Sequence, residues 1–390
     1  MNMKKIIIVN NNMDIGGVQK SLYNLLWAIH GQYEVTLCLF RAAGPYLKQL
    51  PPDVKIVECK GLFRYLGTSQ GQWSGVHKLI RGALALTAKL FGRNVAMKLV
   101  LAGEKALPGQ YDCAVSYLQN GNIKNFYGGV QEYVLKKVRA EKKVAFLHCD
   151  YGSCGANHPH NNRLIGEFDR IAACSDGCRR AFEAVMPELA HKCVTVRNVH
   201  RYDEIRKLAQ KEPVGYEAGR LHVLMVSRLA HEKGIERGIR AAARVRDAGV
   251  DMTLHIVGGG PMEPMLRELT QTLGLTDRVV FYGQQSNPYR YMVGADLFLM
   301  TSFHEAAPMV IEEAVSLGLP VLTTKTTSSE EMVAARNAGW ICENSQEGIN
   351  EVLAQVLSHP EKLREIKDGL LHSSVDNTVA AEQFRGLIEG

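Results

Sequence analysis

The stretch SFHEAAPMVIEEAVSLGLPV, residues 302–321, decides the fold of this chain and indicates its chemistry. It follows the apolar run ADLFLM at 295–300, which predicts a buried strand, and residues 308–317 then have the pattern of a helix. Glu305 therefore lies on a strand-to-helix loop and Glu313 within the helix. The first backbone N–H groups of such a helix lack partners and bind anions, and here they belong to Ala307, Met309 and Val310. A carboxylate beside an anion site suits a ligand that carries hydroxyls and phosphates, and this combination indicates a nucleotide-sugar.

Strands and helices alternate along the whole chain, which predicts parallel sheets with helices on both faces. Short apolar runs give the expected strands at 5–9, 34–40, 55–57, 113–116, 143–147, 171–174, 194–196, 222–226, 252–257, 279–281, 297–300, 321–323 and 340–341. The polar segment 210–220 is expected to link two halves. The predicted fold class is therefore α/β, with two Rossmann-like, doubly wound domains.

Length and composition agree with two domains. A chain of 390 residues can bury two cores, and it has no run of 18 apolar residues that would predict a membrane-spanning helix. The apolar run 6–9 is too short for a signal sequence and is expected to be the first strand, so a cytoplasmic protein is expected. The nine cysteines are an odd number, and several lie in predicted strands, which favours reduced, buried thiols.

Three glycine- or cation-bearing loops follow predicted strands, where α/β folds bind ligands. The loop SRLAHEKG, 227–234, offers Arg228 as a planar fork and Lys233 as a mobile charge for a diphosphate. Gly16 and Gly17 begin a helix after the first strand, where glycine permits a close backbone approach, although a plain tight turn is the alternative. Gly259 belongs to the turn GGGP at 258–261, whose glycines can also be purely structural. None of these loops has the spacing GxGxxG, which disfavours a nicotinamide cofactor.

His148 ends the predicted strand VAFL, 144–147, and is expected to point toward a ligand. A histidine at a strand end is also often a structural residue. His158, His160 and Cys154 match no zinc spacing, so no metal site is expected. The absence of a DxD sequence disfavours a metal-dependent sugar transferase.

These motifs together resemble a known family. Glu305 and Glu313 match the E-x7-E signature of retaining glycosyltransferases of the GT-B fold, family 4 (group 1), and Arg228, Lys233 and Gly234 match its R-x4-K-G element. The resemblance implies that Glu305 contacts the donor sugar, Glu313 the ribose, and Arg228 with Lys233 the diphosphate. It also places Gly17 and His148 near the reacting centre and Gly259 near the nucleotide. Ala306 departs from the family, which more often has glycine there.

The resemblance implies an acceptor-binding domain at 1–205, a nucleotide-sugar-binding domain at 206–376 and a terminal helix at 377–390 that crosses back to the first domain, with a cleft between the domains. The implied reaction moves a sugar from a UDP- or GDP-linked donor to an acceptor hydroxyl, with retention and without a metal or other cofactor. The implied acceptor is lipid-linked or an oligosaccharide, in bacterial surface polysaccharide or glycolipid synthesis. Two alternatives stay open: an enzyme like the UDP-GlcNAc 2-epimerases, which share the architecture, and a non-catalytic partner subunit that binds the sugar nucleotide.

The stretch 60–103 carries seven basic residues and no acidic one, interleaved with large apolar side chains. A basic amphipathic stretch suits the surface of an anionic membrane, here the inner face of the plasma membrane. The alternative is a core-packing helix with a solvated basic face. Nucleic acid is disfavoured as a partner, because the charge is local and no nucleic-acid motif occurs.

Overall fold

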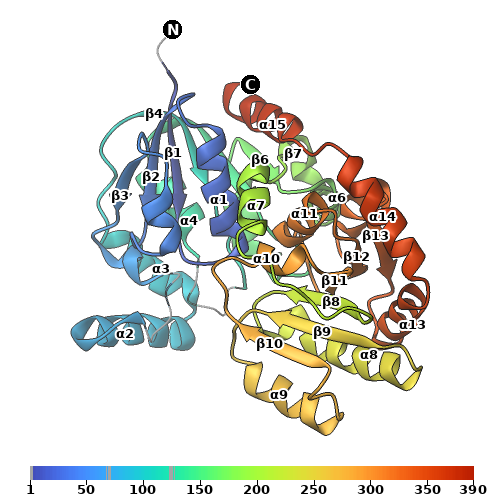
Figure 1. The fold of residues 1–390 in the computed structure, drawn as a ribbon. Coiled ribbons are helices and arrows are strands. Elements are labelled where there is room, and N and C mark those ends of the chain that lie inside the picture. The colour runs from blue at the N-terminus through green and yellow to red at the C-terminus, as the bar shows by residue number, and fades with distance from the viewer. Residues whose placement is uncertain (1–2, 67, 69–71, 123–125, 127) are drawn as a thin grey trace. The chain divides into compact units, whose positions relative to one another are not determined.

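The computed structural model describes residues 3–66, 68, 72–122, 126 and 128–390. The chain forms two compact units, one of Met1–Val199 with Asn377–Gly390 and one of His200–Asp376, which we call unit 1 and unit 2 (Figure 1). The expected boundary at 205/206 lies inside helix α7 (Tyr202–Ala209), a few residues after the observed one. The segment 210–220 belongs to unit 2, because the Val214 N–H donates to the Arg290 carbonyl over 3.0 Å.

Unit 1 contains a parallel sheet of seven strands in the order β3-β2-β1-β4-β5-β6-β7. The strands are β1 (Lys5–Asn10), β2 (Glu34–Leu39), β3 (Lys55–Glu58), β4 (Tyr111–Ser116), β5 (Ala140–Leu147), β6 (Arg170–Ala173) and β7 (Cys193–Thr195). The helices are α1 (Gly17–Ala28), α2 (Gly75–Phe91), α3 (Arg93–Ala102), α4 (Val130–Lys137), α5 (Pro159–Gly166), α6 (Asp176–Val185) and α15 (Thr378–Glu389), with short 3-10 turns η1 (Pro45–Gln49), η2 (Leu62–Tyr65) and η4 (Pro187–Lys192).

Unit 2 contains a parallel sheet of six strands in the order β10-β9-β8-β11-β12-β13. The strands are β8 (Leu221–Val226), β9 (Met252–Val257), β10 (Val279–Gly283), β11 (Leu297–Met300), β12 (Val321–Thr324) and β13 (Gly339–Cys342). Besides α7, the helices are α8 (Ile235–Asp247), α9 (Glu263–Thr272), α10 (Tyr289–Met292), α11 (Met309–Ser316), α12 (Ser329–Met332), α13 (Gln346–Leu357) and α14 (Pro360–His372), with the 3-10 turns η5 (His231–Lys233) and η6 (Ala334–Arg336).

The sheet of unit 2 is buried on both faces, which explains its apolar strands. Side chains alternate along each strand, and Leu297 and Leu299 of β11 pack in one apolar cluster, while Phe298 and Met300 pack in another. In unit 1, Ile6, Ile7, Ile8 and Val9 are completely buried for the same reason. The last helix, α15, belongs to the core of unit 1, where Phe384 packs with residues of α1 and β2.

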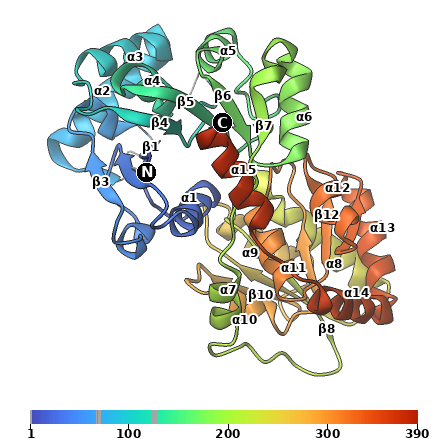
Figure 2. The same cartoon turned by 90° about the horizontal axis from the view of Figure 1, so that it is seen from above.

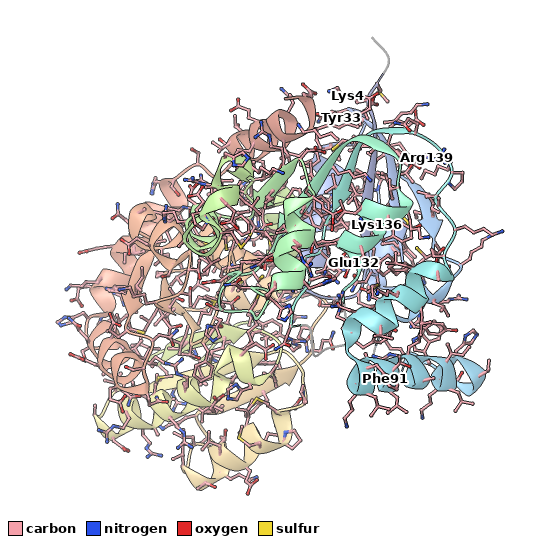
Figure 3. All side chains as sticks on the ribbon, turned by 180° about the vertical axis from the view of Figure 1, so that it is seen from behind. Lys4, Tyr33, Phe91, Glu132, Lys136 and Arg139 are labelled. Carbon is pink, nitrogen blue, oxygen red and sulfur yellow. The ribbon has the colours of Figure 1, made fainter. Side chains whose placement is uncertain are left out.

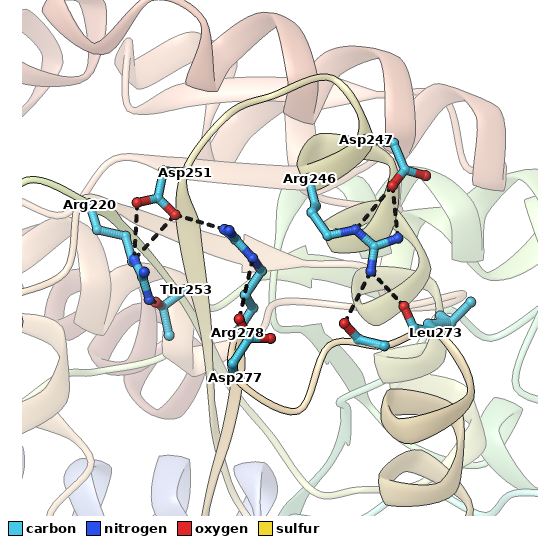
Figure 4. Close-up of polar contacts among 9 residues, drawn as sticks. Arg220, Arg246, Asp247, Asp251, Thr253, Leu273, Asp277 and Arg278 are labelled. Atoms are coloured by element: carbon cyan, nitrogen blue, oxygen red, sulfur yellow. Dashed lines mark hydrogen bonds and ion pairs between the residues drawn. The ribbon is translucent and has the colours of Figure 1, made fainter.

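The amino ends of three strands in unit 2 are joined by charge pairs (Figure 4). Asp251, just before β9, accepts from Arg220 before β8 over 3.2 Å and from Arg278 before β10 over 2.7 Å. These side chains are substantially exposed, so each pair contributes little to stability. The amino edge of this sheet is thus occupied by ion pairs, and the loops at its carboxyl edge carry the predicted ligand-binding residues.

Candidate functional site

The predicted donor site lies at the point in unit 2 where the strand order reverses direction. Strand β8 pairs with β9 on one side and with β11 on the other, so the chain continues from β8 to β9 on one side and from β11 to β12 on the other. Open α/β sheets bind ligands outside the carboxyl ends of their strands at such a point. Arg228 and Lys233 follow β8, and Glu305 follows β11.

Lys233 and Glu305 meet across this switch point. The Lys233 Nζ lies 2.6 Å from Glu305 Oε1, and the Ser302 hydroxyl donates to the same oxygen over 2.8 Å. The two side chains are 25% and 11% exposed, so both are largely removed from solvent without being sealed off. Both hydrogen bonds reach Oε1, so Oε2 is the oxygen that can accept from a ligand hydroxyl.

Gly234 makes this pairing possible. Its φ of +58° lies in the left-handed region, and an added Cβ would stand 2.3 Å from the Thr301 carbonyl oxygen. The Thr301 hydroxyl also donates to the Gly234 carbonyl over 2.7 Å. The loop after β8 can therefore lie directly against the loop after β11 only with glycine at this position.

Arg228 is positioned differently from Lys233. Its guanidinium pairs with Glu232, four residues later, and its side chain is 67% exposed. Burial raises the pKa of Glu232, but a backbone hydrogen bond and Arg228 outweigh it and hold that pKa below the usual range. Arg228 thus belongs to the same loop as Lys233, but its guanidinium is largely exposed to solvent.

Helix α11 begins at Met309, and its N-cap residue, Pro308, provides no side-chain cap. No side chain thus caps the N–H groups of Met309 and Val310, and such groups bind anions, whereas the Ile311 N–H donates to the Pro308 carbonyl over 3.2 Å and Ala307 takes part in another interaction. Glu313 is 7% exposed and accepts a hydrogen bond from the Tyr289 hydroxyl over 3.2 Å. A buried carboxylate held by a tyrosine suits a fixed hydroxyl-binding group better than a surface charge.

Two residues without a sequence signal, Arg237 and Asn344, hold the loop that carries Glu305. The Arg237 guanidinium donates to the Thr301 carbonyl over 3.1 Å and to Asn344 Oδ1 over 2.7 Å, and it lies 4.5 Å from the centre of the Phe303 ring. The Asn344 amide donates in turn to the carbonyls of Phe303, over 3.0 Å, and Lys325, over 3.2 Å. We call this arrangement the Arg237–Asn344 clamp. In the sequence, this clamp is indicated only by the position of Arg237 on the otherwise apolar face of α8.

The glycine turn 258–260 packs on the backbone of the loop after β8. A Cβ at Gly258, whose φ is +146°, would stand 1.8 Å from the Ser227 carbonyl oxygen, and the Leu229 N–H donates to the Gly259 carbonyl over 3.0 Å. Close packing against the backbone therefore explains the glycines of this turn, and the turn supports the segment that carries Arg228.

A chain of buried polar rings ends at Tyr282, next to this turn. His222 Nε2 faces the Glu217 carbonyl over 2.7 Å, and because a carbonyl only accepts, this nitrogen carries the proton. His222 Nδ1 then accepts from His255 Nε2 over 3.0 Å, and His255 Nδ1 accepts from the Tyr282 hydroxyl over 3.0 Å. Burial, with the nearby His222, lowers the pKa of His255 to about 4. The His255 imidazole is therefore neutral near pH 7.

In unit 1, Gly16, Gly17 and His148 lie at the carboxyl edge of the sheet, after β1 and β5. Gly16 has extended backbone, and a Cβ on Gly17 would meet no atom within 4 Å. Neither packing nor a left-handed backbone thus requires glycine at position 17. Helix α1 begins there without a side-chain cap.

Three side chains at this edge have polar atoms that are buried without a hydrogen-bond partner among the described residues. They are Asn10, through its Oδ1, Asn11, through both polar atoms of its amide, and His148, through its Nε2. Strand β4 lies between β1 and β5, and the register places Asn11 and His148 near the same end of all three strands. Burial lowers the pKa of His148 to about 4, although a hydrogen bond to the Tyr117 backbone opposes this shift. A neutral ring and an unpaired amide suit a polar, uncharged ligand group.

His158 and Cys154 do not form a metal cluster. His158 accepts the His160 N–H over 3.2 Å as the N-cap of α5, and no group of three or more potential metal ligands occurs in the part of the chain that the structure describes.

Comparison with known proteins identifies a domain within unit 2. The model of the family described as "Glycosyl transferases group 1" matches residues 207–369. The chain carries a group 1 glycosyltransferase domain. The resemblance inferred from the motifs, to family 4, is thereby confirmed.

Two named relatives are similar to parts of the chain. The chain is 34% identical over 128 residues to lipopolysaccharide glucosyltransferase WaaG of Escherichia coli. The aligned residues are 32% of this chain and 34% of that protein. It is 27% identical over 262 residues to N-acetyl-alpha-D-glucosaminyl L-malate synthase of Bacillus anthracis, covering 65% of this chain and 67% of that protein. The matched region thus spans only about a third of WaaG.

The whole chain also resembles solved structures. Against Anabaena Alr3699/HepE in complex with UDP and glucose the TM-score is 0.66 at 20% identity, covering 98% of this chain and 95% of that chain. At this identity the likeness establishes the fold. The two parallel α/β sheets have the GT-B fold, as the motifs implied.

Proposed function

We propose that the protein is a retaining, metal-independent glycosyltransferase that moves a sugar from a UDP- or GDP-linked donor to an acceptor hydroxyl. The single observation that carries the proposal is the pairing of Lys233 with Glu305 at the switch point of unit 2. A cation and a carboxylate on adjacent loops offer one group for the diphosphate and one for the sugar hydroxyls of a single ligand.

The charges of unit 2 support donor binding there. Glu305 takes one of the three N–H donors of Lys233, so the ammonium can hold a phosphate oxygen as well. The exposed Arg228 adds a second cation on the same loop, and the first turn of α11 adds N–H groups at Met309 and Val310. The buried Glu313 is the proposed ligand of the ribose hydroxyls.

In the proposed reaction the bond between the sugar C1 and the phosphate oxygen breaks, and a bond from C1 to the acceptor oxygen forms on the same face. The acceptor proton goes to the departing phosphate, so no protein carboxylate acts as a nucleophile. Arg228, Lys233 and the start of α11 stabilise the charge that develops on the phosphate, which is electrostatic preorganisation. The roles of Glu305 and Lys233 are thus binding and charge stabilisation.

For unit 1 we propose that His148 hydrogen-bonds the transferred sugar and that the backbone at Gly16 and Gly17 approaches the ligand closely. The neutral, partnerless His148 Nε2 supports a hydrogen-bonding role over proton abstraction. The surroundings of Gly17 support the close approach, because no atom of the described residues would lie within 4 Å of a Cβ at this position.

The proposed acceptor is a lipid-linked or oligosaccharide intermediate of a surface polysaccharide or glycolipid, used by a cytoplasmic protein at the inner face of the plasma membrane. The name of WaaG, a lipopolysaccharide glucosyltransferase, supports this class of acceptor. No helix among the described residues is both long and apolar enough to span a bilayer.

The test begins with the donor. The melting temperature is measured with UDP-glucose, UDP-galactose, UDP-GlcNAc and GDP-mannose, and a rise with one of them identifies the donor class. That donor is then incubated with and without a polyprenyl-diphosphate-linked sugar, in the presence of EDTA, and nucleotide release and products are measured. We expect release that depends on acceptor and a product of retained anomeric configuration.

A UDP-GlcNAc sample that is epimerised without acceptor would assign the chain to the epimerase class instead. Donor binding without any turnover over a panel of acceptors would favour a non-catalytic subunit. Loss of the donor-induced rise in Lys233→Ala, but not in Lys362→Ala, which removes an exposed lysine from α14, would place binding at the predicted site.

A further inference from the structure

Helix α2 exposes a row of large apolar side chains to solvent. The exposed fractions are 63% for Val76, 73% for Leu79, 54% for Leu86, 63% for Leu90 and 69% for Phe91. Soluble proteins expose single apolar side chains routinely, but a contiguous group of this size marks an interaction surface.

The row lies on one face of the helix. Val76, Leu79, Leu86 and Leu90 are separated by three, seven and four residues, which places them along one stripe. The buried residues of α2, Leu84 and Ala88, lie on the opposite side, and α2 packs chiefly on α3 (Figures 1 and 2). Figure 3 shows side chains of α2 projecting away from α3, with Phe91 labelled at the end of the helix.

Helix α3, on which α2 packs, also exposes apolar side chains. Val95 and Leu99, at the spacing of one helical turn, are 42% and 50% exposed. Gly92, with a φ of +85°, connects the two helices, and both expose apolar side chains to solvent. We call the exposed apolar side chains of α2 and α3 the α2–α3 face.

The charge around the α2–α3 face is positive. Lys78, Lys89 and Lys98 are exposed, and no acidic residue occurs between residues 60 and 103. Two other cations of this stretch are used internally. Arg93 is buried in an ion pair of 2.7 Å with Glu132, and Arg81 donates to the Thr68 carbonyl. Phe63 and Tyr65 are likewise buried in unit 1, so the stretch is part core and part surface.

A second copy of the chain is a poor partner for this face. Pairing two α2 helices would bring their lysines together without a nearby carboxylate to neutralise them. An anionic lipid surface has the complementary charge, and it accepts exposed leucine, valine and phenylalanine into the region between headgroups and acyl chains.

We propose that the α2–α3 face docks unit 1 on an anionic membrane, with the apolar row of α2 inserted below the headgroups and the lysines bound to lipid phosphates. This binding is a property of unit 1 and requires no turnover, so its failure is distinguishable from failure of the proposed transfer reaction.

The test is flotation of the full chain with vesicles of phosphatidylcholine containing 30% phosphatidylglycerol and with vesicles of phosphatidylcholine alone. We expect partitioning onto the anionic vesicles at least tenfold above that onto the neutral ones. It should fall when the salt is raised from about 0.15 M to about 1 M, because screening then acts within about 3 Å instead of about 8 Å.

Replacing Leu79, Leu86 and Leu90 together by glutamine should lower partitioning at least tenfold. The matched control replaces three exposed apolar residues elsewhere, Met265, Leu371 and Val379, by glutamine and should bind as the unmodified chain does. The double variant Lys78→Gln/Lys89→Gln should lose the preference for phosphatidylglycerol. Unchanged melting temperatures would show that the variants are folded.

Equal flotation of the unmodified chain and the Leu79/Leu86/Leu90 variant would overturn the proposal. So would a chain that does not float but sediments as a dimer and becomes a monomer in that variant, because the face would then be an interface between copies.

Discussion

Asn344→Ala tests whether the Arg237–Asn344 clamp positions Glu305. The side chain makes four hydrogen bonds, one from the Arg237 guanidinium at 2.7 Å and three to the carbonyls of Phe303, Lys325 and Ser302 at 3.0, 3.2 and 3.5 Å. A neutral hydrogen bond contributes about 1 kcal/mol and one to a charged group about 1.5–3 kcal/mol. Asn344 is exposed, however, so water can replace part of this bonding. We therefore expect a loss of about 1–2 kcal/mol in the free energy of unfolding of unit 2.

The effect on turnover should be larger than the effect on stability. Without Asn344, the loop 301–305 keeps its bond from Arg237 to Thr301 but loses the anchor at Phe303, two residues before Glu305. A misplacement of about 1 Å can cost roughly a hundredfold in rate. We expect kcat to fall about 10- to 100-fold, with a smaller change in the donor KM, because Lys233 and Arg228 stand on a different loop.

Asn344→Asp is the matched variant, because it keeps an acceptor for Arg237 but replaces the two N–H donors by a carboxylate oxygen that repels the carbonyls of Phe303 and Lys325. The assay is steady-state kinetics of nucleotide release together with urea unfolding of both variants. Wild-type kcat in Asn344→Ala, with or without a loss of stability, would refute the reasoning. Full activity in Asn344→Asp with a loss in Asn344→Ala would assign the effect to the bond with Arg237.

Three further predictions concern two buried groups and one exposed glycine. Arg93→Met should lower the free energy of unfolding of unit 1 by about 3–5 kcal/mol, because it leaves the carboxylate of Glu132 buried and unpaired, and adding Glu132→Leu should restore much of the loss in urea unfolding. The His255 imidazole takes up a proton at about pH 4 in the folded protein but near pH 6.5 when unfolded, so its contribution to stability is complete above pH 6.5 and declines as the pH falls toward 4, by roughly 3 kcal/mol. His255→Phe should flatten this part of the urea-midpoint profile, and an unchanged slope would contradict the assignment. Gly17→Ala should fold normally but lower transfer more than tenfold if a ligand approaches the backbone there, and normal transfer would remove position 17 from the site.

The sequence predicted the parts of the fold that depend on local pattern. The buried parallel strands are continuous apolar runs, and each expected strand has a counterpart in the structure that differs by at most a few terminal residues. The loop with Glu305 and the loop with Lys233 could be placed because each follows such a strand directly. Their contact follows from the pairing of β8 with β11, which a parallel sheet of this topology requires.

What the sequence missed depends on contacts between distant segments. Asn344 precedes α13 and has no motif, and it reaches the Glu305 loop only because β13 and β12 bring its segment alongside. Arg93 is one of the seven basic residues of 60–103, and nothing in that stretch indicates that Glu132, 39 residues later, holds it inside unit 1. Asn11 has no motif of its own, and its burial without a partner among the described residues makes it a candidate ligand group.

The central claim is that Glu305 and Lys233 act on one donor molecule at the switch point of unit 2. The most direct test is single-turnover transfer from the identified donor by Glu305→Gln, compared with Glu351→Gln, which alters an exposed glutamate of α13. The account predicts a rate at least a hundredfold lower for Glu305→Gln, with donor binding largely retained, and an unchanged rate for Glu351→Gln. Equal rates for the two variants would contradict it.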